Sequence, residues 1–236
     1  MDEQHADFLE IQKERLPMVD MAIIAVVSGS GLADVFNSLG VAAIVPGGQT
    51  MNPSIKELLQ AVNSVLSEKV VILPNNKNVL LSAGQVQPLT KKLVSVVPSE
   101  TIPEGIAALL AFDYEAEFDT NVQIMTKAKS MVKTIEITRA VRSTKINGLK
   151  IKKKQAIGLL DGKLVAVGAR AVSALSEVLS RVDLTQAEVI TIYYGADTEM
   201  VEAEQFSKDI REQYPQLQIE VVHGGQPHHN YIVSVE

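Results

Sequence analysis

Polar side chains follow four apolar runs of the sequence, and their types could hold a small anion. The four corners span residues 28–31, 47–52, 74–78 and 98–101. Hydroxyl and amide groups can donate hydrogen bonds to a carboxylate or phosphate, and one lysine adds positive charge. We expect ligand or partner binding by Gln49, Thr50, Asn52, Ser54, Asn75, Asn76, Lys77 and Asn78. Turns and helix caps use the same residue types, so a purely structural role stays open.

A second Gly-Gly-Gln tripeptide, at residues 224–226, follows a later apolar run and resembles the first at residues 47–49. Gln226 and His228 are binding candidates at this corner. Three of the four histidines lie here, namely His223, His228 and His229. A zinc or general-base site could use them, but metal sites recruit a further ligand from elsewhere, so we predict a loop with exposed histidines and no metal.

Two arginines in the segment TRAVRST, Arg139 and Arg142, could hold a carboxylate or phosphate at the end of a strand. Their odd spacing directs them to opposite faces of a regular strand, and a role as surface arginines stays open. The spacing of the sequence singles out no catalytic residue. Ser-Gly-Ser-Gly is not the dinucleotide pattern GxGxxG, and a Walker A lysine is absent, so we expect no cofactor in this chain.

Composition excludes several classes of protein. The chain has 22 basic and 28 acidic residues, a net charge of −6, which argues against nucleic-acid or anionic-membrane binding as its main function. The same acidity excludes a peptide-release factor, whose Gly-Gly-Gln tripeptide works beside RNA. The absence of cysteine excludes disulfides and thiolate sites. No run reaches the ~18 to 20 apolar residues of a membrane helix, so we predict no membrane insertion, and a cytoplasmic location is compatible.

The order of predicted elements indicates an α/β protein with two domains. Residues 21–131 alternate continuous apolar strands with amphipathic helices, which is typical of a parallel sheet covered on both faces. In this part Asn52 is expected to cap a helix that has Pro53 in its first turn. Residues 132–236 alternate with period two around a predicted hairpin turn at Asp161-Gly162, then mix strands and helices. We interpret residues 1–20 as a linker or the tail of a helix.

Several segments together resemble the C-terminal region of the ATP-binding subunit of bacterial fatty-acid kinase, a family also described as DAK phosphatase or dihydroxyacetone-kinase-like. They are VPGGQTMNPS, ILPNNKNVLLSA, VPSETIPEGIAALLAFD, TRAVRSTKINGLKIKK and EVVHGGQPHHNYIVSVE. The resemblance covers residues 21–236. It implies a DegV-like fold, a parallel-sheet α/β domain followed by a smaller mixed-sheet domain, which agrees with the reading of the elements.

The resemblance also implies a division of labour. In that family a separate N-terminal helical domain binds ATP and magnesium, and a fatty-acid-binding, DegV-like subunit brings the substrate. This chain would then be a non-catalytic module of a cytoplasmic kinase of lipid metabolism, and the full-length protein could form a homodimer. No catalytic residue carries over, because the metal-holding aspartates belong to the domain that this sequence lacks.

Three hypotheses follow for the polar corners. In the first, they shape a rim that docks the fatty-acid-binding partner. In the second, the chain is a stand-alone small-anion or fatty-acid binding domain, with a ligand between Thr50, Asn76, Lys77 and one of the two arginines. In the third, both Gly-Gly-Gln corners are structural and clamp the two domains together.

Overall fold

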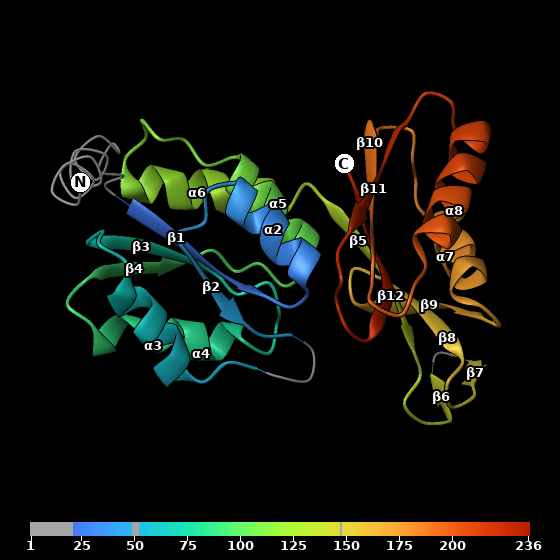
Figure 1. Cartoon of the computed structure of the whole chain (residues 1–236), viewed down its shortest axis with the longest axis horizontal. Coiled ribbons are helices and arrows are strands. Elements are labelled where there is room, and N and C mark those ends of the chain that lie inside the picture. Colours follow the sequence, from blue (N-terminus) through green and yellow to red (C-terminus); the bar gives the residue numbers. More distant parts are fainter. Residues whose placement is uncertain (1–20, 49–51, 147) are drawn as a thin grey trace, which may run out of the picture.

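The computed structural model describes residues 21–48, 52–146 and 148–236, which form two main β-sheets flanked by helices (Figure 1). The first sheet is parallel, with four strands in the order β2-β1-β3-β4. Its strands are β1 (Met21–Val27), β2 (Ala43–Pro46), β3 (Lys69–Leu73) and β4 (Leu93–Val96). All of β1 is buried, because helices cover both faces of the sheet.

Alternate residues of β1 belong to two hydrophobic clusters, one on each face of the sheet. Ile23 and Ala25 pack with α2, α5 and α6, whereas Ile24 and Val26 pack with α3 and α4. The helices are α2 (Ser30–Ser38), α3 (Ile55–Ser64), α4 (Leu80–Gly84), the 3₁₀ turn η1 (Gln87–Leu89), α5 (Ile102–Leu110) and α6 (Phe118–Lys129). The predicted parallel sheet with helices on both faces is confirmed.

The second sheet is mixed and has six strands in the order β11-β10-β12-β5-β8-β9. Only β10 and β11 pair in parallel. Its strands are β5 (Lys133–Arg139), β8 (Ala156–Leu160), β9 (Lys163–Gly168), β10 (Val189–Tyr194), β11 (Gln218–His223) and β12 (His229–Val235). Helices α7 (Ala171–Leu179) and α8 (Met200–Gln213) cover one face. The predicted mixed sheet is confirmed, while the domain boundary at residue 131 stays a prediction.

Two hairpins belong to this second part. Asp161 and Gly162 turn β8 into β9 with positive φ angles of 47° and 72°, as the Asp-Gly pair predicts. A separate hairpin, β6 (Thr144–Ile146) and β7 (Leu149–Ile151), extends from β5 and β8 and lies apart from both sheets (Figure 1). Within the described ranges, no helix combines the length and the hydropathy that a membrane span requires.

The second sheet packs its other face against α2 and α5. Tyr193 on β10 and Ile232 on β12 share a hydrophobic cluster with Leu32 on α2 and Ile106 on α5. The parallel sheet and the mixed sheet are therefore joined through a common apolar core.

The corner at residues 224–226 meets the corner at residues 28–31 at this junction. The backbone N–H of Leu32 donates a hydrogen bond to the carbonyl oxygen of Gly224 at 2.9 Å. A Cβ atom on Gly31 would collide with the carbonyl of His223, so the close approach of the two backbones requires glycine.

The helix after the first Gly-Gly-Gln corner begins later than predicted. Ser54, and not Asn52, is the N-cap of α3. The Ser54 hydroxyl accepts the N–H of Glu57 at 3.3 Å, and the Glu57 carboxylate accepts the N–H of Ser54 at 2.8 Å. The expected Asn52 cap was wrong because this reciprocal Ser-x-x-Glu box satisfies two backbone donors at once.

Candidate functional site

A cavity of about 650 Å³ lies between the carboxyl ends of the parallel strands and the second sheet. One wall comes from the corners after β1, β2 and β3 and from the start of α5, and the other comes from β5, the β8–β9 turn and residues 226–229. Gly47 and Gly48 line one side, and Gln226 lines the cavity from the second part. The two Gly-Gly-Gln corners therefore contribute to the same cavity.

Asn75 fixes the strand ends that form the first wall. It is buried, and its backbone is left-handed with φ of 52°. Its Nδ2 donates to the carbonyl oxygen of Val26 at 3.1 Å, and its Oδ1 accepts from the Ser99 hydroxyl at 2.7 Å. The backbone N–H of Asn75 donates back to Ser99 Oγ at 3.1 Å. The Asn75 side chain is thus committed to holding β1, β3 and the corner after β4 together.

The next three residues shape the edge of the cavity. Asn76 accepts the N–H of Asn78 at Oδ1 and the N–H of Val79 at its carbonyl oxygen, both at 2.9 Å, and so starts the turn into α4. Lys77 and Asn78 are exposed and line the cavity. The positive charge of Lys77 acts on Glu136 of β5 and opposes the rise of its pKa. Lys77 therefore brings a cation to the cavity, as an anion site would require.

Glu136 on β5 and His229 at the start of β12 form a carboxyl–imidazole pair inside the cavity. Their side chains are 15% and 7% exposed, and His229 Nε2 lies 3.5 Å from Glu136 Oε1. Burial raises the pKa of Glu136. Burial and the neighbouring His228 lower the pKa of His229 to about 4, so its imidazole is neutral at neutral pH and the contact is then no ion pair. A buried carboxyl beside a neutral imidazole is suited to accept or donate a proton.

Sequence reasoning missed this pair. Glu136 interrupts the apolar alternation of residues 134–138 at a position that faces away from the helix-covered core, and such positions are commonly solvated. The expectation of an exposed histidine loop fits His223 and His228 but was wrong for His229, which is buried. Only the pairing of β5 with β12 brings the glutamate and this histidine together.

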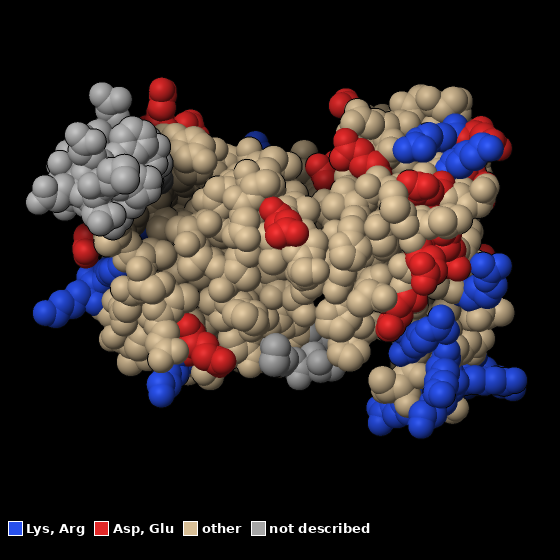
Figure 2. All heavy atoms as spheres, in the orientation of Figure 1, with Lys and Arg blue, Asp and Glu red and all other residues tan. Residues whose placement is uncertain are grey.

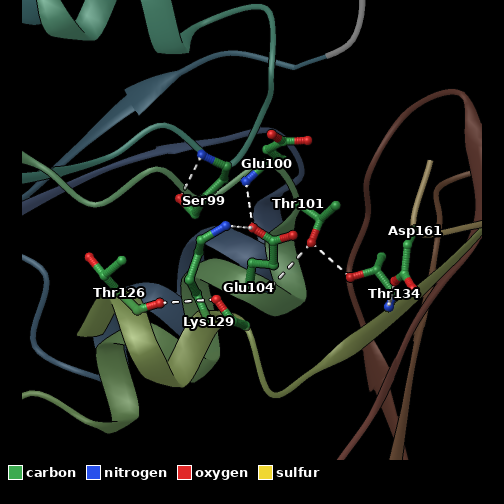
Figure 3. Close-up of polar contacts among 10 residues, drawn as sticks. Ser99, Glu100, Thr101, Glu104, Thr126, Lys129, Thr134 and Asp161 are labelled. Carbon is green, nitrogen blue, oxygen red and sulfur yellow. Dashed lines mark hydrogen bonds and ion pairs between the residues drawn. The ribbon is translucent and has the colours of Figure 1, made fainter. Parts of the chain in front are cut away.

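A chain of polar contacts beside the cavity joins the start of α5 to the second sheet (Figure 3). The hydroxyl oxygens of Thr101 and Thr134 are 2.8 Å apart. The N–H of Thr134 donates to the Asp161 carboxylate at 2.9 Å, and the N–H of Asp161 donates to the carbonyl of Thr134 at the same distance. The β8–β9 turn, β5 and α5 are thereby held in one arrangement.

Glu104 anchors a second set of contacts on α5 (Figure 3). Its carboxylate accepts the backbone N–H of Glu100 at 2.8 Å and the ammonium of Lys129 at 3.2 Å. The cavity is lined by carboxylates as well as lysines, so it is not strongly positive: Lys77, Glu100, Glu104, Lys129, Glu136, Asp161 and Lys163. In the part of the chain that the structure describes, no three histidine or acidic residues gather in a way that could hold a metal ion.

Gln226 and His228 occupy the wall from the second part. Gln226 is buried, and its Nε2 donates to the carbonyl oxygen of Tyr193 at 2.9 Å. Its Oε1 is also buried and accepts no hydrogen bond from the described residues. The carbonyl oxygen of His228 accepts the Thr138 hydroxyl at 2.6 Å, and its backbone is left-handed with φ of 69°. The structure thus places both predicted residues at the cavity, where each also serves the fold.

The other predicted residues are not brought together. Gln49 and Thr50 lie outside the described residues, and Asn52 and Ser54 are exposed and do not line the cavity. Arg139 projects from the end of β5 into a second pocket of about 180 Å³, which Arg170 and Glu202 also line. Arg142 is exposed at the base of the β6–β7 hairpin. A ligand held by Lys77 in the main cavity therefore does not reach Arg139 in this arrangement.

Large aliphatic side chains form a minor part of the cavity lining: Val26, Leu32, Ile102, Leu159 and Ile232. Pockets that bury apolar ligands are predominantly hydrophobic and aromatic. The cavity therefore suits the polar or charged group of a ligand or partner better than a long acyl chain.

Comparison with solved structures defines the class of the protein as DegV-like. The DegV lipid-binding protein of Thermotoga maritima matches with a TM-score of 0.64 and 10% identity, over 92% of this chain and 98% of that chain. The fatty acid kinase (Fak) B3 protein of Streptococcus pneumoniae, solved with linoleic acid, matches with a TM-score of 0.59 and 12% identity, over 92% of this chain and 99% of that chain. Likeness at these identities shows the fold, and the predicted DegV-like fold is confirmed.

The sequence comparisons then identify the family. Residues 22–236 match the FakA-like C-terminal family of fatty acid kinase, and the chain belongs to this family. Protein YloV of Bacillus subtilis is 39% identical over 214 residues, which are 91% of this chain and 39% of YloV. The chain thus spans about two fifths of the length of this relative.

Proposed function

We propose that this chain is the module of a fatty-acid kinase subunit that docks a separate fatty-acid-binding protein. The observation that carries the proposal is a DegV-like fold whose interior is filled by its own side chains. Between the six-stranded sheet and α7 and α8, large apolar side chains are almost fully buried: Ile135, Ile137, Leu175, Val178, Ile190, Ile192, Phe206, Ile210, Tyr231 and Val233. A docking module needs this rigid scaffold, whereas a fatty-acid carrier needs room for an acyl chain.

The docked carrier would present a fatty-acid carboxylate to ATP and magnesium, held by a kinase domain elsewhere in the full-length protein. One carboxylate oxygen attacks the γ-phosphorus of ATP, the bond to the β-phosphate oxygen breaks, and acyl phosphate and ADP result. The residues described here supply the docking surface and no catalytic group. The full-length protein would act in the cytoplasm and could form a homodimer.

Binding measurements with purified proteins test the docking function. The chain is titrated by calorimetry with an oleate-loaded DegV-like fatty-acid-binding protein of the same organism, and separately with radiolabelled oleate and with ATP. We expect a saturable complex with the carrier, and neither oleate retention nor ATP hydrolysis by the chain alone. No complex with any fatty-acid-binding protein of that organism, or stoichiometric binding of oleate by the chain itself, would overturn the proposal.

A second candidate function is binding of a small anion in the cavity. It is favoured by Lys77, which brings its charge to the same cavity as the proton-exchanging pair Glu136 and His229. Titration with acetate, inorganic phosphate and short fatty acids tests it. Saturable binding that Thr50→Ala and Lys77→Ala both abolish, with Asn52→Ala as the control, would support this function. Binding that is absent, or unchanged in the variants, would contradict it.

A further inference from the structure

The β6–β7 hairpin carries a dense cluster of positive charge. We call residues 139–146 and 148–155 the basic arm. It contains seven cations and no acidic residue: Arg139, Arg142, Lys145, Lys150, Lys152, Lys153 and Lys154. The remainder of the sequence has 15 basic and 28 acidic residues, so the net charge of −6 conceals this local excess. Figure 2 shows the cations gathered over β6 and β7, at the lower right of the molecule.

The fold does not neutralise these cations. All seven side chains are exposed, and no ion pair among the described residues involves any of them. Lys145 and Lys150 lie directly opposite each other in the β6–β7 ladder. Like charges at facing positions of a hairpin are destabilising, so this pair weakens the arm unless an external anion lies against it.

Exposed apolar side chains accompany the charge. Val141 is 83% exposed and Ile146 is 44% exposed, and both belong to the arm. Basic residues interspersed with exposed aliphatic side chains are typical of elements that lie on a membrane surface, where charge attracts anionic headgroups and apolar groups enter the interface.

We propose that the basic arm docks the protein peripherally on an anionic lipid surface, a function beyond the docking of a carrier. Five of the seven cations are lysines, and protein–protein interfaces are depleted in lysine and enriched in arginine, so a lipid surface fits better than an acidic protein. The arm has no aromatic side chain on which bases could stack, and the acidic remainder of the chain would repel nucleic acid. The diffuse charge of a phospholipid surface needs no directed hydrogen bonds, and flexible lysines satisfy it.

Sedimentation with vesicles tests this proposal. The whole chain is mixed with vesicles of phosphatidylcholine alone or of phosphatidylcholine and phosphatidylglycerol in equal parts. We expect binding to the mixed vesicles only, and binding should weaken as salt is added. The variant Lys145→Gln/Lys150→Gln/Lys152→Gln/Lys153→Gln should bind at least about tenfold more weakly, because each lysine near an anionic surface contributes roughly fivefold.

A variant of equal charge change separates the arm from general electrostatics. Lys56→Gln/Lys91→Gln/Lys127→Gln/Lys208→Gln removes four exposed lysines outside the arm and should bind mixed vesicles within about twofold of the native chain, since charges beyond a Debye length of ~10 Å are screened. Thermal unfolding of both variants checks that they fold. Equal losses in the two variants, equal binding to neutral vesicles, or absence of vesicle binding while the arm variant loses an acidic protein or DNA would each overturn the proposal. A failure here leaves the carrier-binding measurement unaffected, so the two proposals are separable.

Discussion

The backbone N–H of Leu32 donates a 2.9 Å hydrogen bond to the carbonyl oxygen of Gly224, and this bond ties the first turn of α2 to the corner after β11. The first N–H groups of a helix have no partner within the helix, so a carbonyl from the other sheet is a favourable acceptor. The contact favours the hypothesis that the second Gly-Gly-Gln corner clamps the two parts together. Gln226 adds its bond to Tyr193 at the same corner.

Gly31→Ala should destabilise the protein by about 2 to 3 kcal/mol, because the new methyl group would collide with backbone atoms of His223 that cannot move without opening the junction. Gly84→Ala is the matched control, since a Cβ there meets no atom within 4 Å and the position is helical. It should be neutral or stabilising by up to about 1 kcal/mol. Urea unfolding measures both, and equal effects would contradict the clamp.

Ser54→Ala should cost about 1 kcal/mol of unfolding free energy, because it removes the acceptor for the Glu57 N–H at the start of α3. Asn52→Ala should change stability by less than about 0.5 kcal/mol, as expected for an exposed residue outside the cap. Chemical denaturation compares them. A larger loss for the Asn52 variant would restore asparagine as the cap.

His229 should make stability depend on pH between about 6.5 and 4. Its pKa is lowered to about 4 in the folded protein. Below the unfolded value of about 6.5, the unfolded chain binds a proton that the folded state resists, so the stability from His229 is complete above that pH and is lost as pH falls through 4. The raised pKa of Glu136 acts in the opposite sense, since the folded protein then gains stability from protonation as pH falls.

Comparison of variants isolates the histidine. The stability difference between the native chain and His229→Gln should shrink by up to about 3 kcal/mol between pH 7 and pH 4. His223→Gln, at an exposed histidine in the same segment, should run parallel to the native chain over this range. Parallel curves for His229→Gln would show that its imidazole titrates normally.

Thr101 and Thr134 should be energetically coupled, because their hydroxyl oxygens are 2.8 Å apart across the junction of α5 and β5. A double-mutant cycle with Thr101→Val and Thr134→Val should give a coupling of about 0.5 to 1.5 kcal/mol. The cycle removes the separate contribution of Thr101, which also accepts the N–H of Glu104. A cycle of Thr101 with Thr185, which bonds Asp183 instead, should give coupling near zero.

Much of the fold could be predicted from the sequence, because its strands and helices have strong periodicity. The buried run of β1, the turn at Asp161-Gly162 and the change from parallel to mixed sheet all follow from local patterns. The cap at Ser54 was predictable in principle, since Glu57 stands three residues later. Local competition between Asn52 and Ser54 concealed it.

The candidate site was predictable only in part. The corner at residues 74–78 reaches the cavity because parallel strands end at one edge. Glu136 and His229 could not be found this way, because their contact depends on strand pairing between distant segments and on burial that no local pattern shows. Arg139 lies away from Lys77 because successive residues of β5 face opposite sides of the sheet.

The position of β12 between β10 and β5 has a consequence for biosynthesis. Those two strands are synthesised first but do not pair with each other, and each uses β12 as its neighbour. Until residue 235 leaves the ribosome, the nascent chain therefore displays two open strand edges, which are sites of intermolecular pairing. Closure of this half of the molecule must follow translation of β12, and chaperone protection should matter most in that interval.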